Sequence, residues 1–127
     1  MRTFVLDTSA VIASIQREPG GDALLDGSVK WMLSSVNFAE AVSVLVRKGY
    51  PRRDARQSID AFDIRIVDFD RGLAEDAGAL IAQTKSFGLS LGDRACLALA
   101  ARENVPVLTA DRAWEGVQAG VTIQFIR

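Results

Sequence analysis

The stretch SLGDRACLALAARENVPVLTAD, residues 90–111, carries the pattern on which the fold prediction rests. Its first part is rich in Ala and Leu and predicts a helix capped by Ser90. Asn104 and Pro106 end that helix, and the following β-branched run, Val105–Thr109, predicts a short strand. A helix that leads directly into a strand is the repeating unit of an α/β fold, so further units are expected along the chain.

Strand and helix patterns alternate over the remaining sequence. We expect strands at Thr3–Leu6, Lys30–Ser35, Ile64–Val67, Val105–Thr109 and about Val121–Ile126, and helices at Ala10–Gln16, Asp22–Leu25, Phe38–Lys48, Arg52–Phe62, Arg71–Lys85 and from Ser90 to about Glu103. This alternation predicts a three-layer α/β/α sandwich with a mostly parallel central sheet. With 127 residues and no linker or repeat, we expect one domain over residues 1–127.

Composition limits the classes of protein to consider. Hydrophobic residues make up 49% of the chain and charged residues 24%, which is typical of a soluble globular domain without a membrane span. The single cysteine, Cys96, cannot form a disulfide within the chain and is expected to be a buried apolar residue. We therefore expect a reducing, cytoplasmic location.

The sequence contains no histidine, and this excludes several kinds of catalysis together. Ser-His-Asp and Cys-His nucleophiles, imidazole acid-base chemistry and the usual zinc sites all need that residue. A net charge of −1 also means that no overall field attracts nucleic acid. A hydrolase with this composition must use carboxylates, hydroxyls and metal-bound water.

Four acidic residues are predicted to meet at one edge of the sheet. Asp7 follows the first strand, and Glu40 lies in the first turn of the helix after the second strand. Asp93 lies in the first turn of its helix, and Asp111 follows the strand next along the chain. Ligands of open parallel sheets bind beyond the carboxyl ends of the strands, so these four side chains mark a candidate site.

A purely structural role is the alternative for each acid alone. The spacing Ser90-x-x-Asp93 fits a capping box, and Asn37-x-x-Glu40 resembles one. Asp7 and Asp111 could cap the helices or turns that follow them. Four carboxylates on one edge are harder to explain in this way, because they repel one another by roughly 1 kcal/mol per pair in water.

A divalent cation would relieve that repulsion. Oxygen ligands alone favour Mg²⁺ or Mn²⁺ over zinc. Arg94 and Arg112 each follow an acid directly, so their side chains are expected to point elsewhere. The pattern therefore predicts metal-dependent hydrolysis of phosphodiesters.

Four motifs resemble those of PIN-domain ribonucleases, and most closely the VapC-type toxins of bacterial toxin–antitoxin pairs. They are LDTSAVIA at Asp7, NFAEAV at Glu40, LSLGDRACLALA at Asp93 and VLTADRAW at Asp111. The resemblance implies an endoribonuclease with Mg²⁺ or Mn²⁺ held by these four acids. It also implies a homodimer, and inhibition by a cognate antitoxin whose C-terminal segment covers the site.

Several polar residues near the motifs have two possible roles. Ser9 is expected either to hydrogen-bond an acid or metal-bound water, or to cap a helix, and Thr109 either faces the site or only completes its strand. Asn37 is expected to cap its helix. Glu115 could supply a further acid, but solvent exposure is the simpler expectation.

Outside this edge, the segment Arg47–Arg56 is basic and contains one aromatic residue, Tyr50. It could contact RNA phosphates or form a solvated helix face. Trp31 and Phe38 are expected in the core, and Trp114 is expected to anchor a loop.

Other enzyme classes with this architecture fit less well. A receiver domain needs paired acids after the first strand, and a dehalogenase-like phosphatase needs Asp-x-Asp, where this chain has Asp7 followed by Ser9 at the second position. A glycosidase needs only two carboxylates.

The non-enzyme alternative is a catalytically weak PIN-like module that binds RNA or a partner. The sequence leaves open which RNA is the substrate and whether one or two ions bind.

Overall fold

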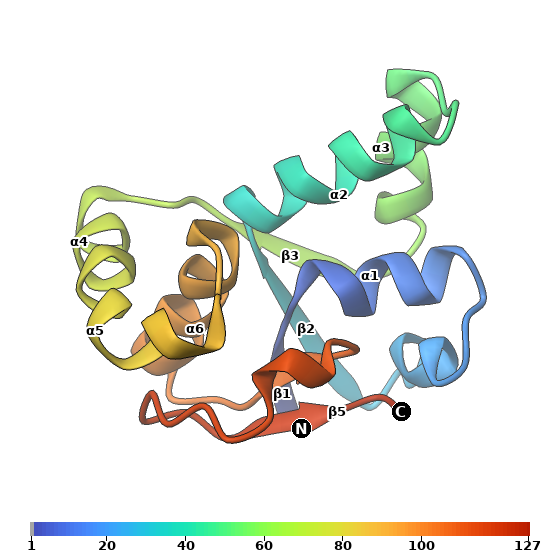
Figure 1. Cartoon of the computed structure of the whole chain (residues 1–127). Coiled ribbons are helices and arrows are strands. Elements are labelled where there is room, and N and C mark those ends of the chain that lie inside the picture. The colour runs from blue at the N-terminus through green and yellow to red at the C-terminus, as the bar shows by residue number, and fades with distance from the viewer. Residues whose placement is uncertain (1) are drawn as a thin grey trace.

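Within residues 2–127, five short strands form one fully parallel sheet in the order β3-β2-β1-β4-β5 (Figure 1). The computed structural model describes residues 2–127. The strands are β1 (Arg2–Leu6), β2 (Val29–Ser34), β3 (Ile64–Val67), β4 (Val107–Thr109) and β5 (Ile123–Phe125). The predicted parallel sheet is confirmed.

Helices cover both faces of the sheet. They are α1 (Thr8–Ile15), η1 (Gly21–Leu25), α2 (Ser35–Arg47), α3 (Arg52–Asp60), α4 (Arg71–Ala79), α5 (Ile81–Thr84), η2 (Lys85–Phe87), α6 (Leu91–Glu103) and η3 (Arg112–Trp114). Figure 1 shows α1, α2 and α3 on one side of the molecule and α4, α5 and α6 on the other. The three-layer α/β/α architecture is therefore also confirmed.

The alternation of side chains along β1 explains why there are two cores. Phe4 and Leu6 face the layer of α1 to α3 and pack there with residues such as Trp31 and Leu45. Val5, between them, faces the opposite layer and packs with Met32 and the α6 body. Both faces of β1 are thus buried, as expected for the central strand of a parallel sheet.

The chain order places a topological switch point beside β1. From β1 the chain adds β2 and β3 on one side, and it later returns to add β4 and β5 on the other. Leu6 of β1 is paired with Leu108 of β4, so both strands end at the same level. Asp7 follows directly after Leu6, and the Asp7 backbone N–H donates to the Leu108 carbonyl at 3.0 Å. The carboxyl ends of β1 and β4 therefore form the place where a ligand is expected.

The prediction of one continuous helix over residues 71–85 is wrong. The segment predicted as a single helix over residues 71–85 is divided into α4, α5 and η2. Gly72 and Gly78 lower its helix propensity. Leu80 has ψ of −12°, which tightens the turn, and the Thr84 hydroxyl donates to the Leu80 carbonyl at 2.8 Å. The amphipathic pattern survives these interruptions, which is why the sequence does not reveal them.

The roles predicted for the core residues are confirmed. Cys96, Trp31 and Trp114 are buried, and Phe38 packs against the core. Within residues 2–127 no helix has both the length and the apolar character needed to cross a membrane.

Candidate active site

Asp7 lies between β1 and α1 and is almost completely buried, with 3% of its surface exposed. It occupies the N-cap position of α1, but its side chain does not cap that helix. Instead Oδ2 accepts hydrogen bonds from the Ser9 hydroxyl at 2.6 Å and the Thr109 hydroxyl at 2.8 Å. The capping explanation therefore does not account for Asp7.

The two hydroxyls that hold Asp7 are themselves oriented by the end of β4. Ser9 Oγ accepts the Ala110 backbone N–H at 2.9 Å, and Thr109 Oγ1 accepts the Asp111 N–H at 3.0 Å. Because both oxygens already accept from the backbone, their protons are available for donation to Asp7. Of the alternatives left open by the sequence, the structure places both Ser9 and Thr109 at the acid.

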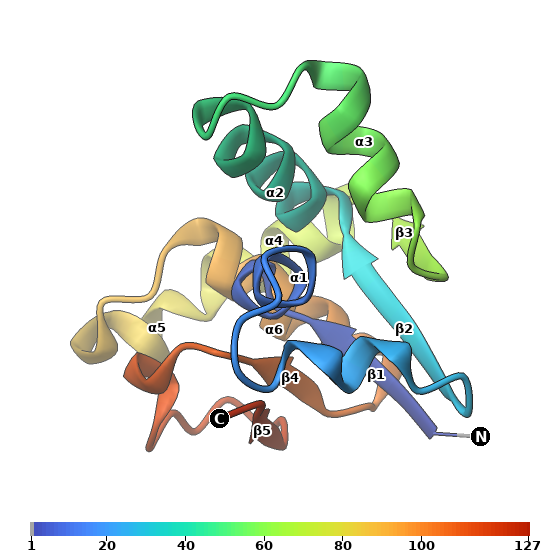
Figure 2. The same cartoon turned by 90° about the vertical axis from the view of Figure 1, so that its right-hand side faces the viewer.

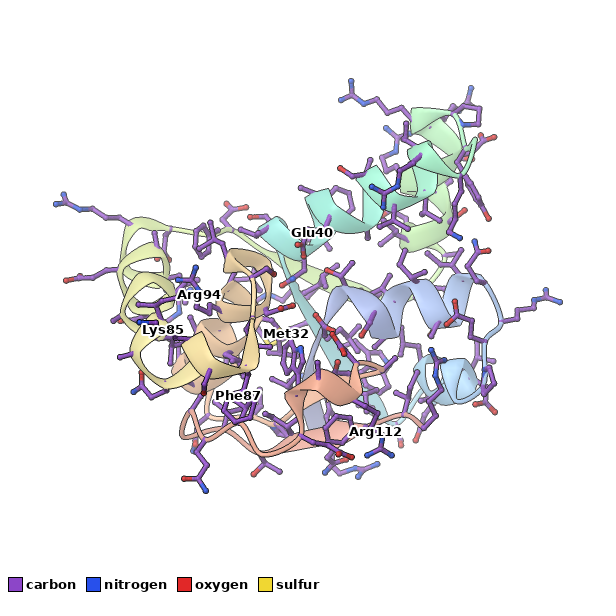
Figure 3. The ribbon with its side chains drawn as sticks, viewed as in Figure 1. Met32, Glu40, Lys85, Phe87, Arg94 and Arg112 are labelled. Atoms are coloured by element: carbon purple, nitrogen blue, oxygen red, sulfur yellow. The ribbon has the colours of Figure 1, made fainter. Side chains whose placement is uncertain are left out.

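Glu40 projects from α2 toward the space between α1 and α6 (Figure 3). Its Oε1 accepts hydrogen bonds from the Thr8 hydroxyl at 2.8 Å and the Asn37 amide at 3.0 Å. Thr8 comes from α1, so two neighbouring helices fix this carboxylate. Thr8 was not predicted as a site residue, although it stands in the sequence between Asp7 and Ser9.

The predicted cap role of Asn37 is wrong. The N-cap of α2 is Ser34, whose hydroxyl accepts the Val36 N–H at 3.2 Å. Three polar residues within four positions, Ser34, Ser35 and Asn37, could each have started the helix. Asn37 instead lies inside the first turn with no exposed surface. Its amide nitrogen also approaches Thr8 Oγ1 at 3.2 Å and the Gly92 carbonyl at 3.0 Å, which joins α1, α2 and α6.

Asp93 and Asp111 do have capping roles. Ser90 and Asp93 form the predicted capping box: Asp93 Oδ2 accepts the Ser90 N–H at 2.8 Å and Ser90 Oγ accepts the Asp93 N–H at 3.2 Å. Asp111 Oδ1 accepts the Ala113 N–H at 2.9 Å and so caps η3. Capping is thus a real contribution of two of the four acids.

In each of the four carboxylates, the hydrogen bonds described above fall on a single oxygen. In the described part of the chain, the second oxygen of Glu40, Asp93 and Asp111 accepts no hydrogen bond, and Oδ1 of Asp7 accepts none from a side chain. An acid that serves only as a cap needs nothing more from its second oxygen. Four such oxygens around one site leave ligand positions for a cation.

Burial and mutual repulsion raise the pKa values of two of the four acids. The pKa of Asp7 is raised from 3.8 to about 6, chiefly by burial and to a smaller extent by the Asp93 charge, against the lowering effect of the Ser9 and Thr109 hydrogen bonds. The pKa of Asp93 is also raised, first by burial and then by the charges of Glu40 and Asp111. Metal binding would reverse these effects, because a bound cation favours the ionised forms.

The two arginines that follow Asp93 and Asp111 in the sequence point away from the acids, as predicted. Arg94 donates to the Ala77 carbonyl at 2.9 Å. Arg112 pairs with Glu115 at 2.7 Å and lies over the Phe125 ring. Glu115 is exposed in that pair and contributes no acid to the site.

All four acids line one open cleft of about 500 Å³. The other charged residues that line it are Glu18 and Arg127, neither of which was predicted as a site residue. Within residues 2–127 no three acidic side chains already converge as a ready ion site. The donor set fits Mg²⁺ or Mn²⁺ in its chemistry, and sharing one ion requires the carboxylates to turn their unbonded oxygens into the cleft.

Comparison with known protein families identifies the family of this chain. The model of the PIN domain matches residues 4–119. The chain belongs to the PIN-domain family. No curated protein matches the sequence.

Several solved structures share the fold of this PIN domain. DNA-bound VapBC from Salmonella typhimurium is 21% identical with a TM-score of 0.76, and all of both chains is covered. VapBC2 from Rickettsia felis, bound to promoter DNA, is 20% identical with a TM-score of 0.74, covering 97% of this chain and 98% of the other. VapC20 from Mycobacterium tuberculosis, described as a toxin that cleaves the sarcin–ricin loop, is 16% identical with a TM-score of 0.73, covering 91% and 97%. At these identities the similarity establishes a shared fold.

Proposed function

We propose that this PIN domain is a Mg²⁺- or Mn²⁺-dependent endoribonuclease that acts as the toxin of a VapC-type toxin–antitoxin pair. The observation that carries the proposal is the set of four carboxylates around one cleft, each with an oxygen that accepts no side-chain hydrogen bond. A site with this much negative charge cannot accept an RNA phosphate unless a cation is present. The VapC20 similarity supports RNA as the substrate class.

Asp7, Glu40, Asp93 and Asp111 would hold the metal. The ion would polarise a phosphoryl oxygen, activate water and neutralise developing charge. The protein residues prepare the ligands for this task. Ser9 and Thr109 donate to Asp7 and favour its ionised form in a buried place, while Thr8 and Asn37 orient Glu40.

The proposed partners follow from the solved relatives. VapBC structures pair toxin and antitoxin, and a further complex of this fold is described as a toxin–antitoxin complex from Klebsiella pneumoniae. We propose a cognate antitoxin that blocks the acidic cleft, and a homodimer or a larger toxin–antitoxin assembly. Binding over the cleft would inhibit cleavage by excluding both RNA and metal.

A second candidate function is an RNA- or partner-binding PIN module with little or no catalysis. The capping roles of Asp93 and Asp111 favour this alternative, because stability alone gives both acids a reason to be present. The two functions differ in whether metal binds and RNA is cut.

The test of the proposed function is mapping of cleaved RNA ends in cells after brief induction. We expect new ends at a small number of positions and growth arrest with the wild-type protein. Neither is expected with Asp93→Asn, which keeps an oxygen for the Ser90 N–H but loses the charge. Cleavage retained in both Asp7→Asn and Asp93→Asn would contradict the mechanism. Absence of new ends in the wild type would support the non-catalytic module.

A further inference from the structure

The end of the chain is fixed beside the acidic cleft. After β5, the Ile126 N–H donates to the Thr109 carbonyl at 2.9 Å. Gly20, with φ of +82°, lies against the Ile126 backbone so closely that a Cβ there would overlap the Ile126 carbonyl. Figure 2 shows this end next to the segment that follows α1. The position of Arg127 is therefore set by backbone contacts on two sides.

The Arg127 guanidinium is held at the rim of the cleft with donors to spare. Nη1 donates to the Pro19 carbonyl at 2.9 Å, and Nη2 donates to Glu18 Oε1 at 2.9 Å. The side chains of Arg127 and Glu18 are 37% and 39% exposed, so solvent and ligands can reach them. A guanidinium has five N–H donors, and two of them are used here.

Arg127 is the sole basic residue among those lining the cleft within the described chain, where Asp7, Glu40, Asp93, Asp111 and Glu18 supply five acids. Metal ions neutralise the carboxylates that bind them, but they do not select where the neighbouring phosphates of an RNA strand lie. A guanidinium binds phosphate oxygens through two parallel N–H donors. The ion pair with Glu18 stabilises the guanidinium at the rim.

We propose that Arg127 contacts a phosphate of the RNA strand beside the scissile bond and so sets the position of the strand in the cleft. This inference rests on the proposed ribonuclease function and adds a substrate-binding residue outside the four acidic motifs. The alternative is that Arg127 only anchors the end of the chain through Glu18 and Pro19.

The test measures binding of a fluorescein-labelled single-stranded RNA of mixed sequence by anisotropy, over a series of KCl concentrations. All variants carry Asp93→Asn to prevent cleavage, and cleavage by the otherwise wild-type protein is measured in parallel. Arg127→Gln is compared with Arg71→Gln, which removes an exposed arginine at the start of α4, away from the cleft. Glu18→Gln removes the ion pair but keeps the arginine.

We expect Arg127→Gln to weaken RNA binding on the order of five- to tenfold. The slope of log K against log salt concentration should fall by about 0.7, the value for one phosphate contact on a single strand. Arg71→Gln and Glu18→Gln should keep the full slope. A Tm loss in Arg127→Gln with an unchanged slope would show an anchoring role and overturn the inference.

If Arg127→Gln does not fold, Arg127→Lys carries the test, because lysine keeps the charge and loses the paired donors. Binding by Arg127→Lys as tight as by the parent protein would then overturn the inference. If the protein binds and cleaves RNA but Arg127→Gln and Arg71→Gln weaken binding equally, the inference about Arg127 is refuted and the proposed function stands. An absence of both binding and cleavage would refute the proposed function together with this inference.

Discussion

Gly92 lies against the carboxylate of Glu40, and a Cβ built on Gly92 would overlap both carboxylate oxygens. Gly92 is in the first turn of α6, and its carbonyl accepts the amide of Asn37, the residue that also holds Glu40. The absence of a side chain at this position thus allows α6 to bring Asp93 close to Glu40. The position of α6 and the placement of the Glu40 carboxylate therefore both depend on the contact between Gly92 and Glu40.

We therefore expect Gly92→Ala to displace the Glu40 carboxylate and to abolish metal binding and RNA cleavage. Its matched control is Gly78→Ala in α4, where an added Cβ meets nothing within 4 Å. That variant should gain roughly 0.5–1 kcal/mol of stability and keep full activity. Isothermal titration with Mn²⁺ and a cleavage assay would check both, and normal metal binding by Gly92→Ala would refute the structural explanation.

The two functions of the α6 start can be separated by two substitutions. Ser90→Ala removes the cap and should cost about 1 kcal/mol, a Tm decrease of about 2–5 °C, with cleavage retained. The Asp93 carboxylate still has the Ser90 backbone N–H in that variant. Asp93→Asn should show the reverse pattern, with cleavage lost and stability kept. Thermal unfolding and cleavage assays on the same preparations measure this, and loss of cleavage in Ser90→Ala would mean that the cap itself positions the acid.

Asp7 should destabilise the metal-free protein at neutral pH. Its pKa rises from 3.8 to about 6 on folding, so the folded state binds this proton more tightly than the unfolded state does. The stabilisation from the bound proton is complete below about pH 3.8 and is lost as the pH rises through about 6. In EDTA, Asp7→Asn should equal the wild type near pH 3.8 and exceed its stability by up to about 3 kcal/mol above pH 6. Urea unfolding across this pH range measures the difference, with Asp60→Asn, an exposed acid of α3, as the surface control whose difference from the wild type should stay well below that of Asp7→Asn.

Divalent cations should stabilise the wild type and not the acid variants. Metal bound only to the folded state raises its stability by mass action, and at a hundred times Kd the gain is about 2.7 kcal/mol. We expect Mg²⁺ and Mn²⁺ to raise the Tm of the wild type and of Asp60→Asn. A Tm that does not respond in the wild type would remove the metal site from the proposal, whereas an equal rise in Asp7→Asn and Glu40→Gln would place the ion elsewhere.

Thr109 should control the pH at which the site binds metal. Its hydroxyl donates to Asp7 and lowers the Asp7 pKa, so Thr109→Val should raise that pKa further. The midpoint pH of Mn²⁺-induced stabilisation should therefore move upward. Thr84→Val is the matched control, because Thr84 is equally buried and its hydroxyl donates to the Leu80 carbonyl far from the acids. An identical midpoint in the two variants would show that the Thr109 hydroxyl has no electrostatic role.

The overall arrangement of the site could be predicted because it depends on chain order. Asp7 and Asp111 each follow a strand, and parallel strands in a switch-point topology bring such residues to one edge. Hydrophobic periodicity was sufficient to find the strands. The prediction did not require knowledge of which side chains contact one another at the carboxyl ends of the strands.

The contacts that orient the acids could not be predicted, because they join helices far apart in the sequence. Asn37 is a plausible cap in sequence, and only the end of β2 at Ser34 decides that it lies inside the helix. The local sequence also does not indicate a site role for Thr8 or Gly92, because their contacts form only where α1, α2 and α6 meet in the fold. Arg127 reaches the cleft through backbone contacts with Gly20 and Thr109 that no local pattern indicates.

The docking of Ile126 on Gly20 also decides how this protein should be tagged. Residues that continue the chain past Arg127 start beside the acidic cleft, so a C-terminal polyhistidine tag would place metal-binding imidazoles next to carboxylates that are proposed to bind metal. Arg2 begins β1, whereas Asp7 follows its last residue, so the two residues lie at opposite ends of this strand. A fusion placed before β1 therefore leaves the cleft open to metal, RNA and inhibitor alike.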